Sequence, residues 1–166
     1  MTEAVLFREG VLRFRGESFR ASLGRTGITA SKHEGDGATP LGLLPLRRVL
    51  YRADRIAKPR ANVPAEPIAP GDGWCDDPRH KDYNRQVVLP HPASHEQLWR
   101  DDPLYDVIGV LGWNDAPIEP FRGSAIFLHV ATHDYSPTAG CVALLLRDLM
   151  RILADGLSAI RVQAAS

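Results

Sequence analysis

A cysteine and a histidine are the side chains of this sequence best suited to covalent chemistry. Cys141 follows Gly140 and precedes an apolar run, so its thiol stands where a tight turn enters a buried element. His129 lies near the end of another apolar run, 125–130. A nearby imidazole lowers the pKa of a thiol and favours the nucleophilic thiolate, and backbone N–H groups beside a glycine can hold an oxyanion. On spacing alone, a buried structural cysteine and a core histidine remain open as the alternative.

A second set of polar residues lies in a segment that also carries many prolines. These residues are aromatic, acidic or amide-bearing: Trp74, Asp76, Asp77, Tyr83 and Asn84. They could line a substrate groove, or they could pin a proline-rich loop. The glycine-rich stretch 32–37 lacks the GKS/T ending of a phosphate-binding loop, so we interpret it as a hairpin turn bordering the cleft.

Histidines offer a different mechanism. His129 and His133 have an H-x3-H spacing, and His80, His91 and His95 lie in the proline-rich segment. On a strand, residues four apart share a face, so a zinc peptidase is an alternative class of enzyme. The sequence has no HExxH motif, and Cys75, the other cysteine, has no CxxC partner. We therefore predict no metal site.

Composition narrows the classes of function. The 166 residues are 44% hydrophobic and 24% charged, with 20 basic and 20 acidic side chains. A net charge of zero disfavours a nucleic-acid partner. The charge is unevenly spread, with a basic first third and a more acidic remainder, which suits a zwitterionic ligand. No apolar run is long enough for a membrane segment, and no leader is recognisable. We expect a cytoplasmic protein, or a periplasmic one if a leader has been removed.

The elements that would position these residues are mostly strands. Alternating apolar residues predict strands near 5–8, 11–15 and 18–23. Later strands are expected at 43–51, 104–111, 124–130 and 158–162. Pro45 indicates an edge strand or an early position in one. Leucines and a methionine at helical spacing, with Gly156 beyond them, predict one helix near 147–155, and a second short helix is expected at 93–100.

Prolines set the organisation of the middle of the chain. Seven of the 13 prolines fall between residues 59 and 92. We interpret about 58–92 as a lid-like excursion, because a linker would leave two pieces too small to fold. The prediction is a single domain over 1–166, mainly β, closed or sandwiched, with one or two short helices.

Two motifs resemble those of a known family. The run from His129 through Ser136-Pro-Thr138-Ala139-Gly140-Cys141-Val142 resembles the signature of the L,D-transpeptidase (YkuD-type) catalytic domain. The turn Thr39-Pro40-Leu41-Gly42 is similar to the family's Thr-Pro-x-Gly turn. The resemblance spans roughly residues 5–163. It implies the family's β-sandwich or barrel fold and no cofactor.

The resemblance also implies roles for individual residues. Cys141 would be the nucleophile and His129 its general base, acting on peptidoglycan stem peptides or muropeptides, with Thr138, Ala139 and Gly140 forming the active-site loop. The sequence departs from the pattern where Ala139 replaces a histidine and Ala143 replaces an arginine or asparagine. The spacing from His129 to Cys141 is also short for the family. His133 could stand in for the missing histidine.

These departures bear on what accepts the acyl group. The resemblance implies cleavage between residue 3 of the stem, a diamino acid, and D-alanine 4, through a thioester. We favour an L,D-carboxypeptidase, in which water is the acceptor. The alternatives are an L,D-transpeptidase that forms 3-3 cross-links, a zinc peptidase, and an inactive module that binds wall peptides.

Overall fold

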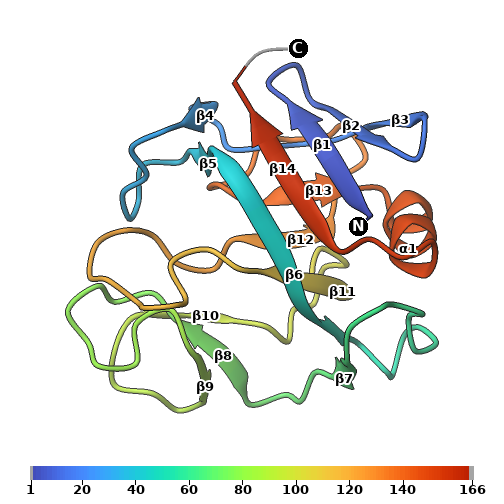
Figure 1. Ribbon diagram of the computed structural model, residues 1–166. Coiled ribbons are helices and arrows are strands. Elements are labelled where there is room, and N and C mark those ends of the chain that lie inside the picture. The colour runs from blue at the N-terminus through green and yellow to red at the C-terminus, as the bar shows by residue number, and fades with distance from the viewer. Residues whose placement is uncertain (1, 165–166) are drawn as a thin grey trace.

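A large mixed sheet dominates the protein. The computed structural model describes residues 2–164, which contain fourteen strands and one helix. The main sheet runs in the order β13-β12-β11-β6-β14-β1-β2-β3, with β7 beside β6 (Figure 1). Its strands are β1 (Glu3–Phe7), β2 (Val11–Phe14), β3 (Glu17–Arg20), β6 (Gly42–Tyr51), β7 (Ala65–Pro67), β11 (Val107–Leu111), β12 (Phe127–Val130), β13 (Val142–Leu144) and β14 (Ala159–Gln163). The two smaller sheets are β4 (Ile28–Thr29) with β5 (Thr39–Pro40), and β8 (Asp72–Cys75) between β9 (Gln86–Val88) and β10 (His95–Gln97).

The large sheet nearly closes on itself. Its two ends are β13 and β3, and the chain just after β3 returns to β13. Ser22 N–H donates to the Ala143 carbonyl at 2.8 Å, and Ala143 N–H donates to the Ser22 carbonyl at 3.0 Å. This closure gives the mainly β barrel or sandwich that the sequence predicts, and it leaves the β13 edge covered.

Strand β6 is the long strand at the centre of the sheet. Its residues up to Pro45 pair with β14, and its residues from Leu46 onward pair with β11. Pro45 therefore falls where the pairing partner changes, and its carbonyl accepts Gly112 N–H at 2.7 Å. The prediction of an early position was right, but an edge position was wrong, because a proline is tolerated in a central strand where its missing donor is not needed.

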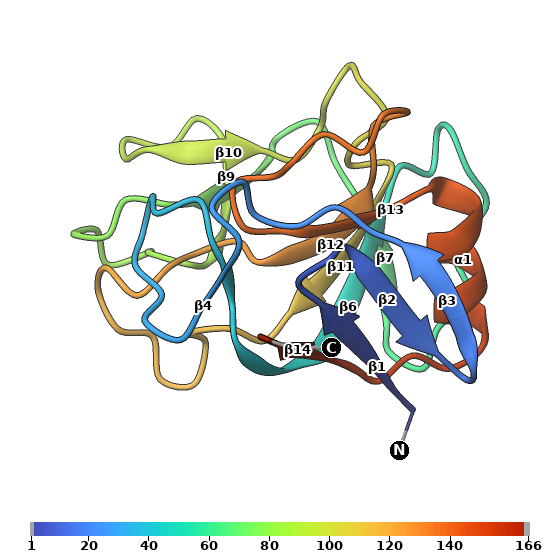
Figure 2. The ribbon, with the colours of Figure 1, turned by 90° about the horizontal axis from the view of Figure 1, so that it is seen from above.

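Helix α1 (Leu146–Ala154) follows β13 and packs on one side of the barrel, away from the β8–β9–β10 sheet (Figure 2). It confirms the helix predicted near 147–155. Its buried face includes Leu149 and Leu153. Gly156 ends it with φ of +92° and donates its N–H to the Leu153 carbonyl at 3.1 Å, as a glycine beyond a helix C-terminus commonly does.

The segment expected to hold a second helix is a strand instead. Residues 93–100 contain β10, which pairs antiparallel with β8, with Glu96 opposite Trp74. Glu96 and Leu98, just after the strand, are less exposed than Gln97 between them, which is the period of two expected of a strand. The polar residues around them obscured this pattern in the sequence. The proline-rich segment, about 58–92, contains three further short strands, β7, β8 and β9. Helix α1, the one helix among residues 2–164, is not long and apolar enough to cross a membrane.

Strands β12 and β13 separate two parts of the core. Leu128, Val130 and Val142 face the larger part, which includes the buried side of α1. On the opposite face, Phe127 and Cys141 belong to a second cluster, which also includes Trp74 of the β8–β9–β10 sheet. The site is built on this second face.

Candidate active site

The thiol and the imidazole share one face of the β12–β13 pair. The two strands are parallel, with His129 opposite Ala143 and Leu128 opposite Val142. Side chains alternate along a strand, so Cys141, directly before β13, points to the same side as His129. The two residues are diagonal neighbours on this face. Both side chains line a single cavity of about 430 Å³.

The thiol of Cys141 is buried and held by two backbone groups. It donates to the Ala125 carbonyl at 3.2 Å and accepts the Phe127 N–H at 3.4 Å. Burial, followed by the negative charge of Glu96, raises the pKa of this thiol to about 12. Lys32, on the same cavity, acts in the opposite direction. Desolvation therefore outweighs the effect of the nearby cation and favours the protonated thiol.

His129 is buried with a neutral ring. Burial lowers its pKa below the ordinary value of 6.5. Its Nδ1 lies 3.0 Å from the Val130 carbonyl, and because a carbonyl only accepts, Nδ1 carries the proton and Nε2 is the unprotonated nitrogen of the neutral ring. The ring also packs edge to face against Tyr105, with centroids 5.3 Å apart. A neutral imidazole next to a protonated thiol can accept the thiol proton during attack.

The loop before the thiol is tightly tied. Gly140 N–H donates to Thr138 Oγ1 at 3.1 Å, and Thr138 Oγ1 donates to the Cys141 carbonyl at 2.6 Å. The buried Thr39 hydroxyl donates to the Gly140 carbonyl at 2.9 Å. The Thr-Pro-x-Gly turn and the cysteine loop, 101 residues apart, therefore contact one another. Gly140 has φ of +137°, and a Cβ there would lie 2.7 Å from the Ala38 carbonyl oxygen, so glycine is required.

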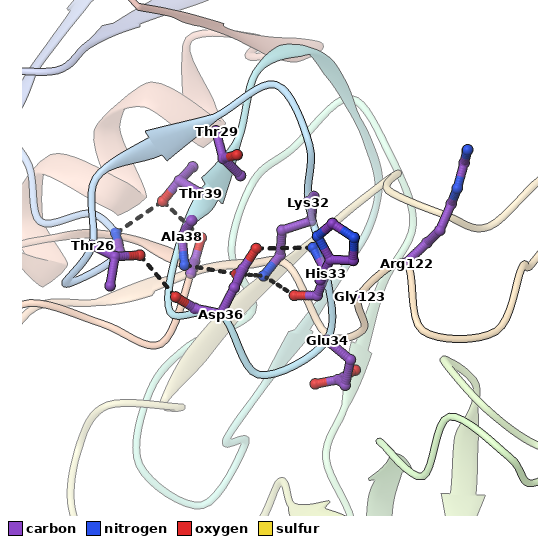
Figure 3. A network of polar contacts seen from close by, with 12 residues as sticks. Thr26, Thr29, Lys32, His33, Glu34, Asp36, Ala38, Thr39, Arg122 and Gly123 are labelled. Atoms are coloured by element: carbon purple, nitrogen blue, oxygen red, sulfur yellow. Dashed lines mark hydrogen bonds and ion pairs between the residues drawn. The ribbon is translucent and has the colours of Figure 1, made fainter.

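The glycine-rich loop lines the cavity, as the sequence predicted, but it is not a hairpin turn, because β4 and β5 on either side of it pair in parallel. The Lys32 ammonium pairs with Asp36 and donates to the His33 carbonyl at 3.1 Å (Figure 3). Asp36 also accepts the N–H of His33 at 2.8 Å and of Ala38 at 2.9 Å. Lys32, Glu34 and two glycines of this loop line the cavity. The loop is thus held by its own ion pair and presents its backbone to the site.

The predicted groove residues separate into two groups. Asp76 lines the cavity, as do Thr138, Ala139 and Ala143. Among residues 2–164, the cavity lining does not include the other proposed groove residues, which are Trp74, Asp77, Tyr83 and Asn84, nor does it include His133. His133 is exposed in the loop after β12. Its side chain is therefore not placed to replace the histidine missing at Ala139.

Asn84 is the centre of a buried hydrogen-bond network. Its Oδ1 accepts Trp74 Nε1–H and Ala125 N–H, both at 3.0 Å. Its Nδ2 donates to the carbonyls of Trp113 and Asn114, both at 2.9 Å. All four hydrogen-bonding positions of the amide are used. The geometry favours the alternative that these residues pin the proline-rich segment.

Tyr83 takes part in the same pinning. Its hydroxyl donates to Glu34 at 2.7 Å and accepts the Gly123 N–H at 2.8 Å. Glu34 also accepts the Ser124 hydroxyl at 2.6 Å. Tyr83 therefore connects the excursion to the glycine-rich loop and to the segment before β12.

Three metal-ligating side chains come together away from the thiol. Ligand atoms of Cys75, His80 and His91 lie within 4.8 Å of one another. Both histidines accept a backbone N–H at Nδ1, and His91 Nε2 lies 3.0 Å from Asp82 Oδ2. Hydrogen bonds thus account for the orientation of both rings. His129 and His133 are not in this group, so the H-x3-H spacing does not make a shared site.

Sequence reasoning missed one wall of the cavity. Glu96, Arg100 and Tyr105 all line it. Tyr105 donates its hydroxyl to Glu96 at 2.7 Å, and Arg100 pairs with Asp102. The signal was the period of two around Glu96, which the expectation of a helix concealed.

The fold and the site together define a class of protein: a mainly β domain in which a thiol and an imidazole face one cavity. The sequence profile of YkuD, the L,D-transpeptidase catalytic domain, matches residues 2–158, and the chain belongs to this family. The family is one of peptidoglycan enzymes of the L,D-transpeptidase type.

The chain also has a weak similarity to a solved structure. The helical cell shape determining protein Pgp2 from Campylobacter jejuni is 14% identical, with a TM-score of 0.43. The similarity covers 99% of this chain and 48% of that one, so the chain spans about half the length of Pgp2. No curated protein matches the sequence.

Proposed function

We propose that the protein is an L,D-carboxypeptidase of peptidoglycan stem peptides. It would cleave the bond between the diamino acid at position 3 and D-alanine 4, through a thioester on Cys141. The observation that carries this proposal is the placement of Cys141 and His129 on one strand face, lining one cavity.

The protonation states support a coupled proton transfer. Because burial raises the pKa of Cys141 and lowers that of His129, both groups are neutral at pH 7. As Sγ attacks the carbonyl carbon, its proton passes to Nε2 of His129. The oxyanion forms beside the backbone N–H of Gly140, which would leave Thr138 Oγ1. The imidazolium then protonates the leaving nitrogen, and D-alanine departs.

The second half of the reaction returns the enzyme to its starting state. Water attacks the thioester carbonyl and gives a proton to His129. The carbon–sulfur bond breaks, the proton passes from His129 to Sγ, and the tripeptide leaves as a carboxylic acid that ionises in solution. Hydrolysis is favoured because Ala139 and Ala143, two of the cavity-lining positions, carry methyl groups where the family usually has polar side chains. Those methyl groups offer an incoming amine no hydrogen bonds.

One observation favours L,D-transpeptidation as a second candidate. Asp76 and Glu96 line the same cavity, and neither forms an ion pair with another described residue. Arg100 acts on Glu96 electrostatically, whereas the buried Oδ1 of Asp76 has no hydrogen-bond partner among the described residues, and this oxygen could bind the ammonium of an acceptor stem.

The test is incubation with a stem tetrapeptide, with and without an excess of an amine acceptor. The carboxypeptidase proposal expects tripeptide and free D-alanine in both mixtures, unaffected by a chelator and abolished in Cys141→Ala. A cross-linked dimer as the main product with acceptor would favour the transpeptidase. Binding of the tetrapeptide without any D-alanine release would overturn the proposal and favour a binding module. Loss of activity with chelator would favour a zinc peptidase.

A further inference from the structure

Tyr105 and Glu96 form a buried polar pair to which the proposed reaction gives no role. Tyr105 precedes β11 and is 7% exposed. Its hydroxyl donates to Oε1 of Glu96, a residue of β10, at 2.7 Å. Both side chains line the cavity that holds the thiol and the imidazole. A phenylalanine and a leucine would fill much the same space without burying a carboxyl group, which is costly.

The Tyr105 ring lies directly against His129. The two ring centroids are 5.3 Å apart, with the planes at 75°. Phe127 supports the tyrosine ring edge to face at 5.8 Å, and the Arg100 guanidinium lies 5.2 Å from its centroid. The tyrosine ring is therefore held by the Glu96 carboxyl at its hydroxyl and by Phe127 and Arg100 along the ring.

The contacts of His129 show why such a support is needed. The hydrogen bond from Nδ1 to the Val130 carbonyl selects the tautomer, and the Leu104 backbone adds a second polar interaction with the ring. The second side-chain torsion of histidine is broad, so packing must set the plane of the ring. The plane of the ring decides whether Nε2 is aimed at Cys141, its diagonal neighbour.

We propose that Tyr105, anchored by Glu96, is the positioning residue that aims His129 at the thiol. The consequence for catalysis rests on the function proposed above, whereas the effect on the imidazole does not. The anchor rather than the tyrosine ring alone is the essential part, since the ring without its hydroxyl could slide within the cavity. Glu96 acts through Tyr105 and then through His129.

The test compares variants that keep or break the anchor. Tyr105→Phe and Glu96→Leu break it, whereas Glu96→Gln keeps a carbonyl that can accept the tyrosine hydroxyl. We expect kcat for D-alanine release to fall by roughly 10-fold to 100-fold in the first two, with KM within about 2-fold, because a misaimed base affects the chemical step. Glu96→Gln should retain most of the activity.

NMR of the His129 imidazole gives a readout that does not depend on turnover. In Tyr105→Phe and Glu96→Leu, the pKa of His129 should rise toward its ordinary value as the ring gains access to solvent, and the acid limb of the pH profile should move with it. Tyr83→Phe is the matched control. It removes another buried tyrosine hydroxyl that donates to a carboxylate at 2.7 Å, on Glu34, and it should leave the His129 signals unchanged.

The outcomes separate this inference from the proposed function. Unchanged His129 signals and unchanged kcat in both anchor-breaking variants would overturn the positioning role, as would equal losses in Glu96→Gln and Glu96→Leu. If the unmodified protein releases no D-alanine, the proposed function fails, and the imidazole signals still decide whether Tyr105 positions the ring. A fall in melting temperature without a change at His129 would assign the pair a structural role only.

Discussion

Two polar regions of the molecule meet at Ala125 and are built in opposite ways. Around Asn84, every hydrogen-bonding position of the side chain has a protein partner. Around Cys141 and His129, each side chain is fixed by backbone groups and still faces a cavity. A polar side chain with all its partners inside the protein stabilises the fold, and one that keeps a lone pair or a proton toward a cavity is available for chemistry.

The meeting point also links the two regions mechanically. Asn84 Oδ1 accepts the N–H of Ala125, and the carbonyl of Ala125 accepts the thiol of Cys141. Ala125 has φ of +53°, a conformation uncommon for residues other than glycine. The network around Asn84 therefore holds in place the backbone group that holds the nucleophile.

The largest effect is expected from removing the reactive groups. Cys141→Ala should lower D-alanine release by more than roughly 10³-fold, and His129→Ala should follow closely, because nucleophile and base act as one unit. Both variants should fold, which circular dichroism can check. Comparable activity in Cys141→Ala would remove the cysteine region from the reaction.

The next largest effect falls on stability. Asn84→Ala should lower the free energy of unfolding by about 3 kcal/mol, because it leaves several buried backbone groups without partners. Activity should fall as well, through Ala125. The control is Asn62→Ala, which loses a single hydrogen bond to the Gly156 carbonyl and should cost about 1 kcal/mol. Equal unfolding curves for the two variants would contradict a structural hub at Asn84.

A smaller loss is expected in the loop before the thiol. Gly140→Ala places a methyl group 2.7 Å from the Ala38 carbonyl oxygen at a φ of +137°, and should cost about 2 kcal/mol while reducing activity. Gly16→Ala tests strain alone, because Gly16 has φ of +79° with nothing within 4 Å of the added carbon. If thermal unfolding and activity were equally affected in both variants, the close approach to Ala38 would have no role.

The smallest effect is the pH dependence of stability. Burial lowers the pKa of His129 below 6.5, so below that pH the unfolded chain binds a proton that the folded chain does not, and stability falls as the pH falls. Burial raises the pKa of Cys141 from 9.0 to about 12, so above pH 9 stability falls as the pH rises.

Chemical denaturation at a series of pH values checks this pattern. Between pH 8 and pH 10, the free energy of unfolding of Cys141→Ala should fall by about 1 kcal/mol less than that of the unmodified protein, because the variant lacks the thiol. The variant Cys141→Ala should leave the acid limb unchanged. An alkaline loss identical in the variant would mean that the thiol titrates normally.

The sequence predicts most of the strands and the reactive pair for different reasons. Strands near the N-terminus follow from alternation, and β11 and β12 follow from continuous apolar runs; both signals need only local information. The placement of Cys141 and His129 follows from the motif, and the helix near 147–155 from its spacing and Gly156. The closure between Ser22 and Ala143 is long-range and leaves no local pattern.

The residues around the cavity show which features the sequence alone does not predict. Trp74, Tyr83 and Asn84 have the residue types of a binding groove, and only their partners reveal a structural network. Glu96 and Tyr105 reach the cavity through the pairing of β10 with β8 and through the position of β11, which residue types alone do not specify.

The most direct test of the account is the site of the covalent intermediate. The protein is mixed with a stem tetrapeptide, quenched in acid, digested and analysed by mass spectrometry. The account predicts an added mass equal to the tetrapeptide minus D-alanine, on the peptide that contains Cys141 and absent in Cys141→Ala. D-alanine release with no adduct on Cys141, or with the adduct on Cys75, would contradict it.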